Sequence, residues 1–205
     1  HVMRELGTVL IHGVAIKPGK PVILAIADNK PVIGLPGYPV SAYIDFATFV
    51  KPVMEMLTGA VSDAQPMEEA VVSKRLVSSL KHKEYVRVKV GEVNGRLVAS
   101  PLARGAAAAT SLVKADGVCV IDQNLEGYEA GETVQVELWR PRDEIRHTIV
   151  SVGSHDMIMD FLADLLPTLF PGMHLSSTHV GSMAGLMALK RGESHIAPTH
   201  LLDEE

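Results

Sequence analysis

The sequence has one cysteine, few aromatic residues and no long apolar run. Cys119 is the only cysteine among 205 residues, so a disulfide framework and a multi-cysteine metal site are both excluded. No stretch reaches the run of about 18 apolar residues that a membrane-spanning helix needs, and the first residues lack the charged-then-apolar form of a signal peptide. A cytoplasmic protein without a membrane partner is therefore the expectation.

The charge and the motif content leave several functional classes without support. The net charge of −5 disfavours a general nucleic-acid binder, because such proteins neutralise many phosphates with basic residues. None of the nine histidines shows the His-x-x-x-His or His-Glu-x-x-His spacing of a zinc site on a helix, and no P-loop or Gly-x-Ser-x-Gly elbow occurs. We expect no nucleic-acid partner, and no catalytic residue is assigned.

Two lysines flank a Pro-Gly turn near the start of the chain. Residues 15–21 read Ala-Ile-Lys-Pro-Gly-Lys-Pro. Pro18 has a restricted φ whereas Gly19 is free to adopt positive φ, so the chain can reverse and leave the amines of Lys17 and Lys20 on one side. This arrangement suits a polyanion such as a phosphate, although an ordinary solvated turn has the same sequence.

A second turn, rich in proline and glycine, leads into a predicted helix. Residues 34–42 read Gly-Leu-Pro-Gly-Tyr-Pro-Val-Ser-Ala, and apolar residues then recur with helical spacing. We expect a helix over about residues 40–58, distorted at Pro52 and ended by Gly59. Ser41 and the free amides of its first turn would face whatever the lysines hold, unless the segment is only a common loop.

These two segments, joined by a predicted hairpin over residues 22–35, resemble the molybdopterin molybdenumtransferase family, which includes MoeA and the gephyrin E domain. The similarity is to the second half of its cofactor-binding domain, with Tyr38 in place of the usual Asn. The resemblance implies that residues 1–61 are the C-terminal half of a molybdopterin-binding α/β domain. It also implies that the anionic cofactor is bound by Lys17, Lys20, Pro36, Gly37, Pro39 and Ser41.

Residues 70–140 change to short alternating strands. Apolar and polar residues alternate between turns at 85–90, 96–100, 117–121 and 133–138. This pattern predicts a compact antiparallel, barrel-like β domain, and the alanines at 105–110 predict a turn of helix. The region is similar to the small C-terminal β domain of the same family.

Two positions in this region depart from the family pattern. Lys81-His82 stands where the family often has Gly-Arg, and Gly105-Ala106 stands where it often has Gly-Ser. If those family groups hold substrate, this chain lacks one permanent charge and one hydroxyl. Arg87 and Arg104 are candidates to substitute for them, although a solvated strand face explains both arginines more simply.

Residues 146–205 change character again. Strands are predicted at 148–153, 174–180 and 194–198, with helices at 156–166 and 182–191 between them. This βαβαβ order implies a parallel sheet with right-handed crossovers. The region resembles the N-terminal part of the periplasmic-binding-protein-like domain that is fused to molybdenum-cofactor and molybdate-response proteins. Since such domains bind ligand between two lobes, we expect an incomplete cleft.

One edge of that sheet is a second candidate site. Strand carboxyl ends and helix N-termini meet there, and serine hydroxyls with helix amides suit an oxyanion. The candidate ligand-binding residues are Ser154, His155, Gly181, Ser182 and His200. Ser154 and Ser182 have an alternative role as helix caps, with Asp156 complementing the helix dipole.

The chain as a whole is predicted to be an α/β and β multidomain fragment. The resemblance implies insertion of molybdate into adenylylated molybdopterin, with Mg²⁺ as cofactor, AMP as product and a homodimer in the full-length protein. Because the chain starts at His1 within a domain, we expect the metal ligands to precede it and the isolated fragment to be inactive. The alternative is a regulatory module whose C-terminal unit senses molybdate, tungstate or molybdenum cofactor.

Overall fold

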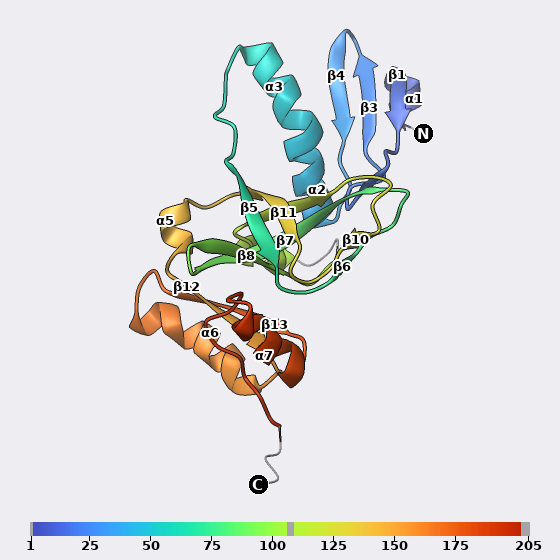
Figure 1. Cartoon of the computed structure of the whole chain (residues 1–205). Coiled ribbons are helices and arrows are strands. Elements are labelled where there is room, and N and C mark those ends of the chain that lie inside the picture. Colours follow the sequence, from blue (N-terminus) through green and yellow to red (C-terminus); the bar gives the residue numbers. More distant parts are fainter. Residues whose placement is uncertain (1, 106–108, 202–205) are drawn as a thin grey trace.

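The computed structural model describes residues 2–105 and 109–201. It has three parts in chain order: an N-terminal sheet with a helix, a closed β-sheet in the middle, and a smaller α/β unit at the other end (Figure 1). The predicted combination of mixed α/β structure with a barrel-like sheet is confirmed. Within these residues no helix is long and apolar enough to cross a membrane.

The N-terminal part is a three-stranded antiparallel sheet in the order β1-β3-β4. Its elements are α1 (Val2–Leu6), β1 (Thr8–His12), β3 (Ile23–Ala27) and β4 (Lys30–Gly34). Asp28 and Asn29 adopt positive φ, of 50° and 60°, as both central residues of a tight two-residue hairpin turn do. The predicted hairpin over residues 22–35 is therefore present, with its turn at Asp28 and Asn29.

The predicted helix over residues 40–58 is one helical segment in three pieces. They are α2 (Pro39–Asp45), the π-helical turn η1 (Phe46–Val50) and α3 (Lys51–Thr58). The segment ends at Gly59, which has a φ of 70°. The expected distortion at Pro52 lies just before it, at η1, because proline lacks an N–H and its ring crowds the preceding turn, which a wider turn accommodates.

The middle of the chain is a closed ring of five strands. They are β5 (Met67–Val72), β7 (Lys83–Val93), β8 (Arg96–Pro101), β9 (Gly117–Ile121) and β11 (Thr133–Leu138). The order β7-β8-β5-β11-β9 closes because β9 also pairs with β7. Side chains at every second position, such as Val86, Val88 and Val90, fill the interior.

The strand pairing differs from the predicted antiparallel sheet at one pair within the ring. β5 and β8 run parallel, because the chain reverses direction twice between them. The first reversal includes β6 (Leu76–Val77), which pairs with β10 (Gly127–Tyr128). Of the predicted helical turn at 105–110, residues 106–108 lie outside the described residues, and α4 (Ala109–Lys114) begins directly after them.

The C-terminal unit contains two parallel strands and two helices. After the short α5 (Arg142–Ile145), the elements are β12 (Thr148–Gly153), α6 (Met157–Leu169), β13 (His174–His179) and α7 (Ser182–Lys190). The predicted third strand at 194–198 is only a bridge between Ser151 and Ile196. The predicted end of α6 before Pro167 is wrong, since the ring of proline keeps φ in the helical range and removes only one donor.

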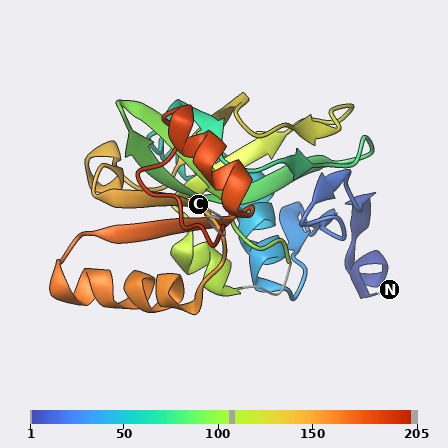
Figure 2. The same ribbon diagram turned by 60° about the horizontal axis from the view of Figure 1, so that its bottom comes forward.

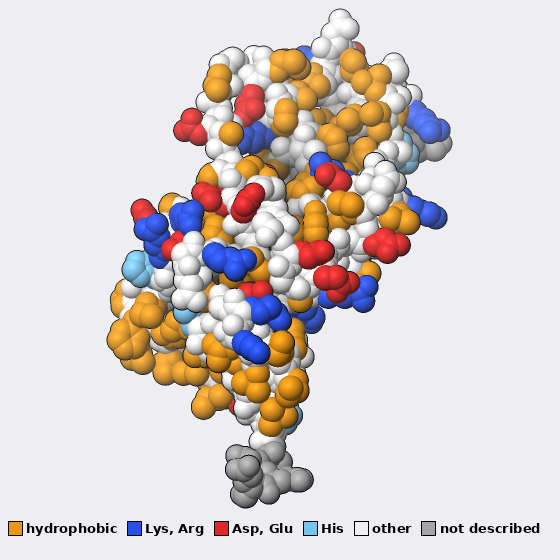
Figure 3. All heavy atoms as spheres, in the orientation of Figure 1, with side chains coloured by type: hydrophobic (Ala, Val, Ile, Leu, Met, Phe, Trp, Pro, Cys, Tyr) orange, Lys and Arg blue, Asp and Glu red, His pale blue; other side chains and the backbone are white. Residues whose placement is uncertain are grey.

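The C-terminal unit packs directly on the barrel. Val93 and Val98 of the barrel form one buried cluster with Val150, Val152 and Ala188 of the C-terminal unit. Figure 2 shows β12 and β13 lying against the barrel, with α6 on the outside. Exposed apolar side chains gather over α6 in the space-filling view (Figure 3).

Candidate anion-binding site

A cavity of about 540 Å³ lies between the lysine turn (residues 17–20) and the barrel. Four of the six residues predicted to bind the anionic cofactor line it, namely Lys17, Lys20, Pro36 and Ser41. Gly37 and Pro39 do not; Pro39 is the first residue of α2 instead. The other wall includes Glu84 and Arg87 of the barrel strand β7 and Arg104 and Gly105 of the segment that follows β8.

Backbone pairing fixes the lysine turn against the barrel. β2 (Ile16–Lys17) runs parallel to β7, with Lys17 opposite Glu84. The Val14 amide donates to the Lys20 carbonyl at 2.9 Å and closes the turn. Gly19 at its tip has a φ of 116° and lies against Asp45, so a side chain there would clash as well as strain the backbone.

The buried carboxylate of Glu84 pairs with two cations of the cavity, Lys17 and Arg104. Glu84 is only 3% exposed, and its Oε1 lies 3.6 Å from Lys17 Nζ and 3.1 Å from Arg104 Nη1. Ser78 Oγ donates to its other oxygen at 2.9 Å. Glu84 therefore holds Lys17 and Arg104, which are far apart in the sequence, at one cavity, while both keep exposed surface for a ligand.

Arg87 is a second barrel cation at this cavity. It is buried, with Nε donating to Ser111 Oγ at 2.8 Å and Nη2 to the Ala103 carbonyl at 2.9 Å. Burial and the charge of Arg104 lower its pKa, but an arginine stays charged at neutral pH. The solvated-face interpretation is wrong for Arg87, which is buried. Arg104 is exposed, as that interpretation expects, but it also pairs with Glu84.

Glu84 was missed by sequence reasoning, although a signal for it exists. Side chains alternate faces along a strand, so Glu84 shares a face with Val86 and Val88, which are both buried. A carboxylate on such a face needs a partner. The sequence does not show that the partners are Lys17 and Arg104.

Asp45 lies directly under the lysine turn and has no hydrogen-bond partner for either carboxylate oxygen among the described residues. Its side chain is fully buried against Gly19. Burial raises the pKa of Asp45 to about 7, because an isolated charge in a low-dielectric site is unfavourable. The protonated and ionised forms therefore coexist near neutral pH.

The second candidate site is only partly assembled. The Oγ atoms of Ser154 and Ser182 lie 2.7 Å apart, and the His200 amide donates to Ser182 Oγ at 3.2 Å. Gly181 is the N-cap residue of α7 and provides no side-chain cap. His155 instead packs edge-on against His179, with ring centroids 4.3 Å apart.

Helix capping does not account for the two serines. Asp156 caps α6 by accepting from the Ile158 amide at 2.8 Å, and neither serine caps α6 or α7. Ser154 and Ser182 are both buried and hydrogen-bonded to each other. The arrangement presents few free donors to a ligand.

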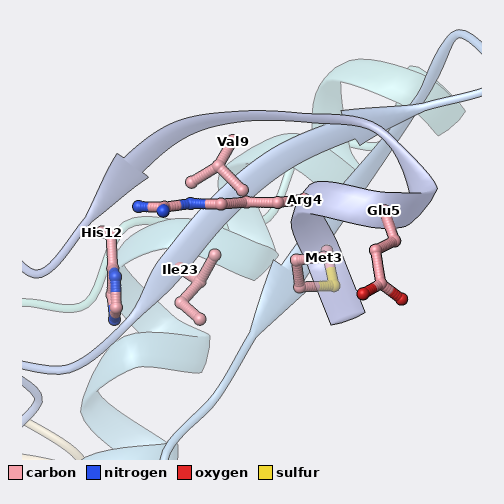
Figure 4. Close-up of a pocket in the computed structure, with 6 residues that line it drawn as sticks. All are labelled: Met3, Arg4, Glu5, Val9, His12 and Ile23. Carbon is pink, nitrogen blue, oxygen red and sulfur yellow. The ribbon is translucent and has the colours of Figure 1, made fainter. Parts of the chain in front are cut away.

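A smaller cavity of about 310 Å³ lies beside α1. Figure 4 shows the Arg4 side chain extending past Val9 toward His12, with Ile23 and Met3 along the wall and Glu5 pointing away. It contains none of the predicted site residues. The cavity at the lysine turn therefore remains the main candidate.

The two segments that form the two walls of the cavity match two separate family models. Residues 1–56 match the family described as "Probable molybdopterin binding domain", and residues 69–139 match "MoeA C-terminal region (domain IV)". The resemblance to the molybdopterin molybdenumtransferase family is confirmed. Residues 163–205 match "PBP superfamily domain", as the predicted resemblance of the C-terminal unit requires.

Individual relatives of the molybdopterin molybdenumtransferase family are similar to about two thirds of the chain. A protein of Methanocaldococcus jannaschii named for molybdopterin biosynthesis is 36% identical over 137 residues, which are 66% of this chain and 31% of that protein. A molybdopterin molybdenumtransferase of Bacillus subtilis is 32% identical over 141 residues, 68% of this chain and 33% of its own. The chain spans about a third of the length of these curated relatives.

A solved structure gives the same result. The crystal structure of a molybdopterin biosynthesis MoeA protein from Pyrococcus horikoshii matches with a TM-score of 0.56 and 34% identity. The match covers 68% of this chain and 34% of that one.

Two of the three departures from the molybdopterin molybdenumtransferase pattern lie at the cavity, and the third, at Ala106, falls outside the described residues. Tyr38, in place of the usual Asn, is 60% exposed and lines it. His82, in place of an arginine, lines it as well, with Nδ1 at 3.0 Å from Ser79 Oγ. Arg104 supplies a permanent charge at the same wall.

Proposed function

We propose that this chain contributes part of the substrate site of a molybdenum-cofactor biosynthesis enzyme, which inserts molybdate into adenylylated molybdopterin. The supporting observation is the convergence of Lys17, Lys20 and Arg104 on one cavity, together with the Ser41 hydroxyl. Phosphate groups are held by such fixed cations and donors. These residues act by positioning and electrostatic holding.

In this proposal each predicted domain has its own role. Residues 1–61 and 70–140 form the two walls of the substrate site, and residues 146–205 are a fused unit. We include the homodimer in the proposal as the full-length assembly. Mg²⁺ belongs to the proposal as the cofactor of the full-length enzyme. We assign it no ligand in this chain, since the described residues contain no group of three or more His, Cys, Asp or Glu side chains able to hold a metal ion.

Binding of adenylylated molybdopterin tests the proposal. We expect Lys17→Ala to weaken the affinity by about tenfold to a hundredfold, because a charge-assisted hydrogen bond contributes roughly 1.5–3 kcal/mol. Lys30→Ala is the matched control, since Lys30 is exposed at the β3–β4 turn and does not line the cavity. Titration at fixed ionic strength that finds equal affinities for the two variants would contradict the site.

Chemistry is tested separately from binding. The chain, incubated with adenylylated molybdopterin, molybdate and Mg²⁺, is expected to release no AMP, because it spans about a third of its relatives. AMP release at the rate of a full-length enzyme would show that the reaction needs only these residues. If the unchanged chain does not bind adenylylated molybdopterin, the substrate site is rejected whatever the AMP assay shows.

A second candidate function is sensing of an oxyanion by the C-terminal unit. It is favoured by the convergence of Ser154, Ser182 and His200 at one edge of the parallel sheet. Calorimetric titration with molybdate and tungstate tests this function, with Ser182→Ala as the variant. Binding that Ser182→Ala leaves unchanged would reject it.

A further inference from the structure

A different cavity lies at the junction between the barrel and the C-terminal unit. It measures about 430 Å³ and shares no lining residue with the cavity at the lysine turn. One wall comes from β7, β8 and α4, and the other from α6 and the first half of β13. Figure 2 shows α4 beside α6 at this junction. The cavity is thus at the opposite end of β13 from Ser182.

The barrel wall of this junction cavity carries fixed positive charge. Asp116 is fully buried, and its Oδ1 lies 3.0 Å from Lys89 Nζ and 2.7 Å from Arg140 Nη1. Its other oxygen accepts the Val90 amide at 2.9 Å. Arg140 Nε also lies 3.1 Å from Glu144 Oε2, but the Glu144 side chain is 56% exposed, so the buried part of this wall holds two cations and one carboxylate. Lys114 adds a further cation at the rim.

Two polar groups on β13 complete the inner wall. Ser176 is 2% exposed and lines the cavity, and its Oγ has no hydrogen-bond partner among the described residues. Since buried hydroxyl groups are nearly always hydrogen-bonded, this one is available to bind a ligand or a water molecule. His174 also lines the cavity, and burial together with the charges of Lys89 and Arg140 lowers its pKa, against the opposing charges of Asp116 and Glu144.

The acidic residues at this cavity lie on its outer wall. Asp160 and Asp164 come from α6. The Asp160 side chain is 70% exposed, whereas Lys89 and Arg140 are 14% and 24% exposed. Water and salt screen exposed charges far more than half-buried ones. The charges of Lys89 and Arg140 are therefore screened less than those of the acidic residues on α6.

We propose that the junction cavity binds a small tetrahedral oxyanion, of the phosphate or molybdate class, held by Lys89, Arg140 and the hydroxyl of Ser176. The bound ion bridges the barrel and the C-terminal unit. Neither the substrate cavity nor the edge at Ser182 takes part. The proposal stands whether or not the chain acts in cofactor biosynthesis.

The titration of His174, followed by NMR, provides a local readout of occupancy. Inorganic phosphate and molybdate are added separately to the whole chain. Either ion in the cavity favours the imidazolium form, so we expect the pKa of His174 to rise in a saturable way. Ser176→Ala should weaken the effect by about tenfold, as loss of a hydrogen bond to a charged ligand does.

Matched variants separate this site from the others. Ser151→Ala removes another buried hydroxyl without a described partner, on the neighbouring strand and outside the cavity, and should leave the response unchanged. The response should also persist in Lys17→Ala/Lys20→Ala. The proposal is overturned if neither ion changes the titration of His174, if the two serine variants behave alike, or if the response needs the two lysines.

Discussion

At the scale of single residues, two of the buried carboxylates, Glu84 and Asp45, have opposite surroundings. Glu84 is satisfied by Lys17, Arg104 and Ser78, whereas Asp45 has no partner among the described residues. A paired carboxylate gains stability in its ionised form, and an unpaired one loses it. Asp45 is therefore the residue through which pH should act on the stability of this region.

We predict that Asp45 makes the protein less stable as pH rises from about 4 to about 7. The folded-state pKa is about 7 against 3.8 for an unperturbed carboxyl, so within this window only the folded state binds the proton and the free energy of unfolding falls with pH. The ionised form costs roughly 4 kcal/mol above pH 7. Asp45→Asn should remove most of this slope in urea unfolding at pH 5 and pH 8.

Asp63→Asn provides the control for this measurement, because Asp63 is an exposed carboxylate in the segment before β5. It should keep the slope of the unchanged protein. Equal slopes for all three proteins would mean that the Asp45 carboxyl is solvated.

At the scale of elements, close contact between β7 and β12 depends on a missing side chain. A Cβ on Gly91 would clash with Val150 and would lie 3.1 Å from the Thr148 carbonyl oxygen. Gly91→Ala is therefore expected to destabilise the protein by about 1–3 kcal/mol through overpacking. Thermal unfolding measures this, with Gly37→Ala as the control, since nothing lies within 4 Å of a Cβ there. Equal thermal unfolding midpoints for Gly91→Ala and Gly37→Ala would show that β7 and β12 can move apart at little cost.

At the scale of the molecule, the barrel and the C-terminal unit share one buried cluster, so we expect them to unfold together. Val93, Val98, Val150 and Val152 pack in a single cluster, and Ser73 Oγ lies 3.1 Å from Thr178 Oγ1 across the junction. Val150→Ala should therefore reduce amide-exchange protection in β7 and β13 alike, by about 2 kcal/mol from a lost buried side chain. Protection lost in β13 alone would mean that the units fold independently.

The sequence by itself determined the local features of this protein. The hairpin turn, the helix ended by Gly59 and the barrel strands follow from short-range periodicity and from backbone preferences of glycine and proline. The family resemblance also depended on short motifs, around Lys17 and Ser41. The parallel β5–β8 pair was not predicted, because strand order depends on how the chain is routed.

Only the tertiary structure decided which distant residues meet. Lys17 and Arg104 share Glu84 across the two walls of the cavity, and Lys89 and Arg140 share Asp116. Periodicity gives the face of a strand on which each residue lies but not its partner on another element. The charged cavities arise from those partnerships, because burial and pairing fix the cations where a ligand can reach them.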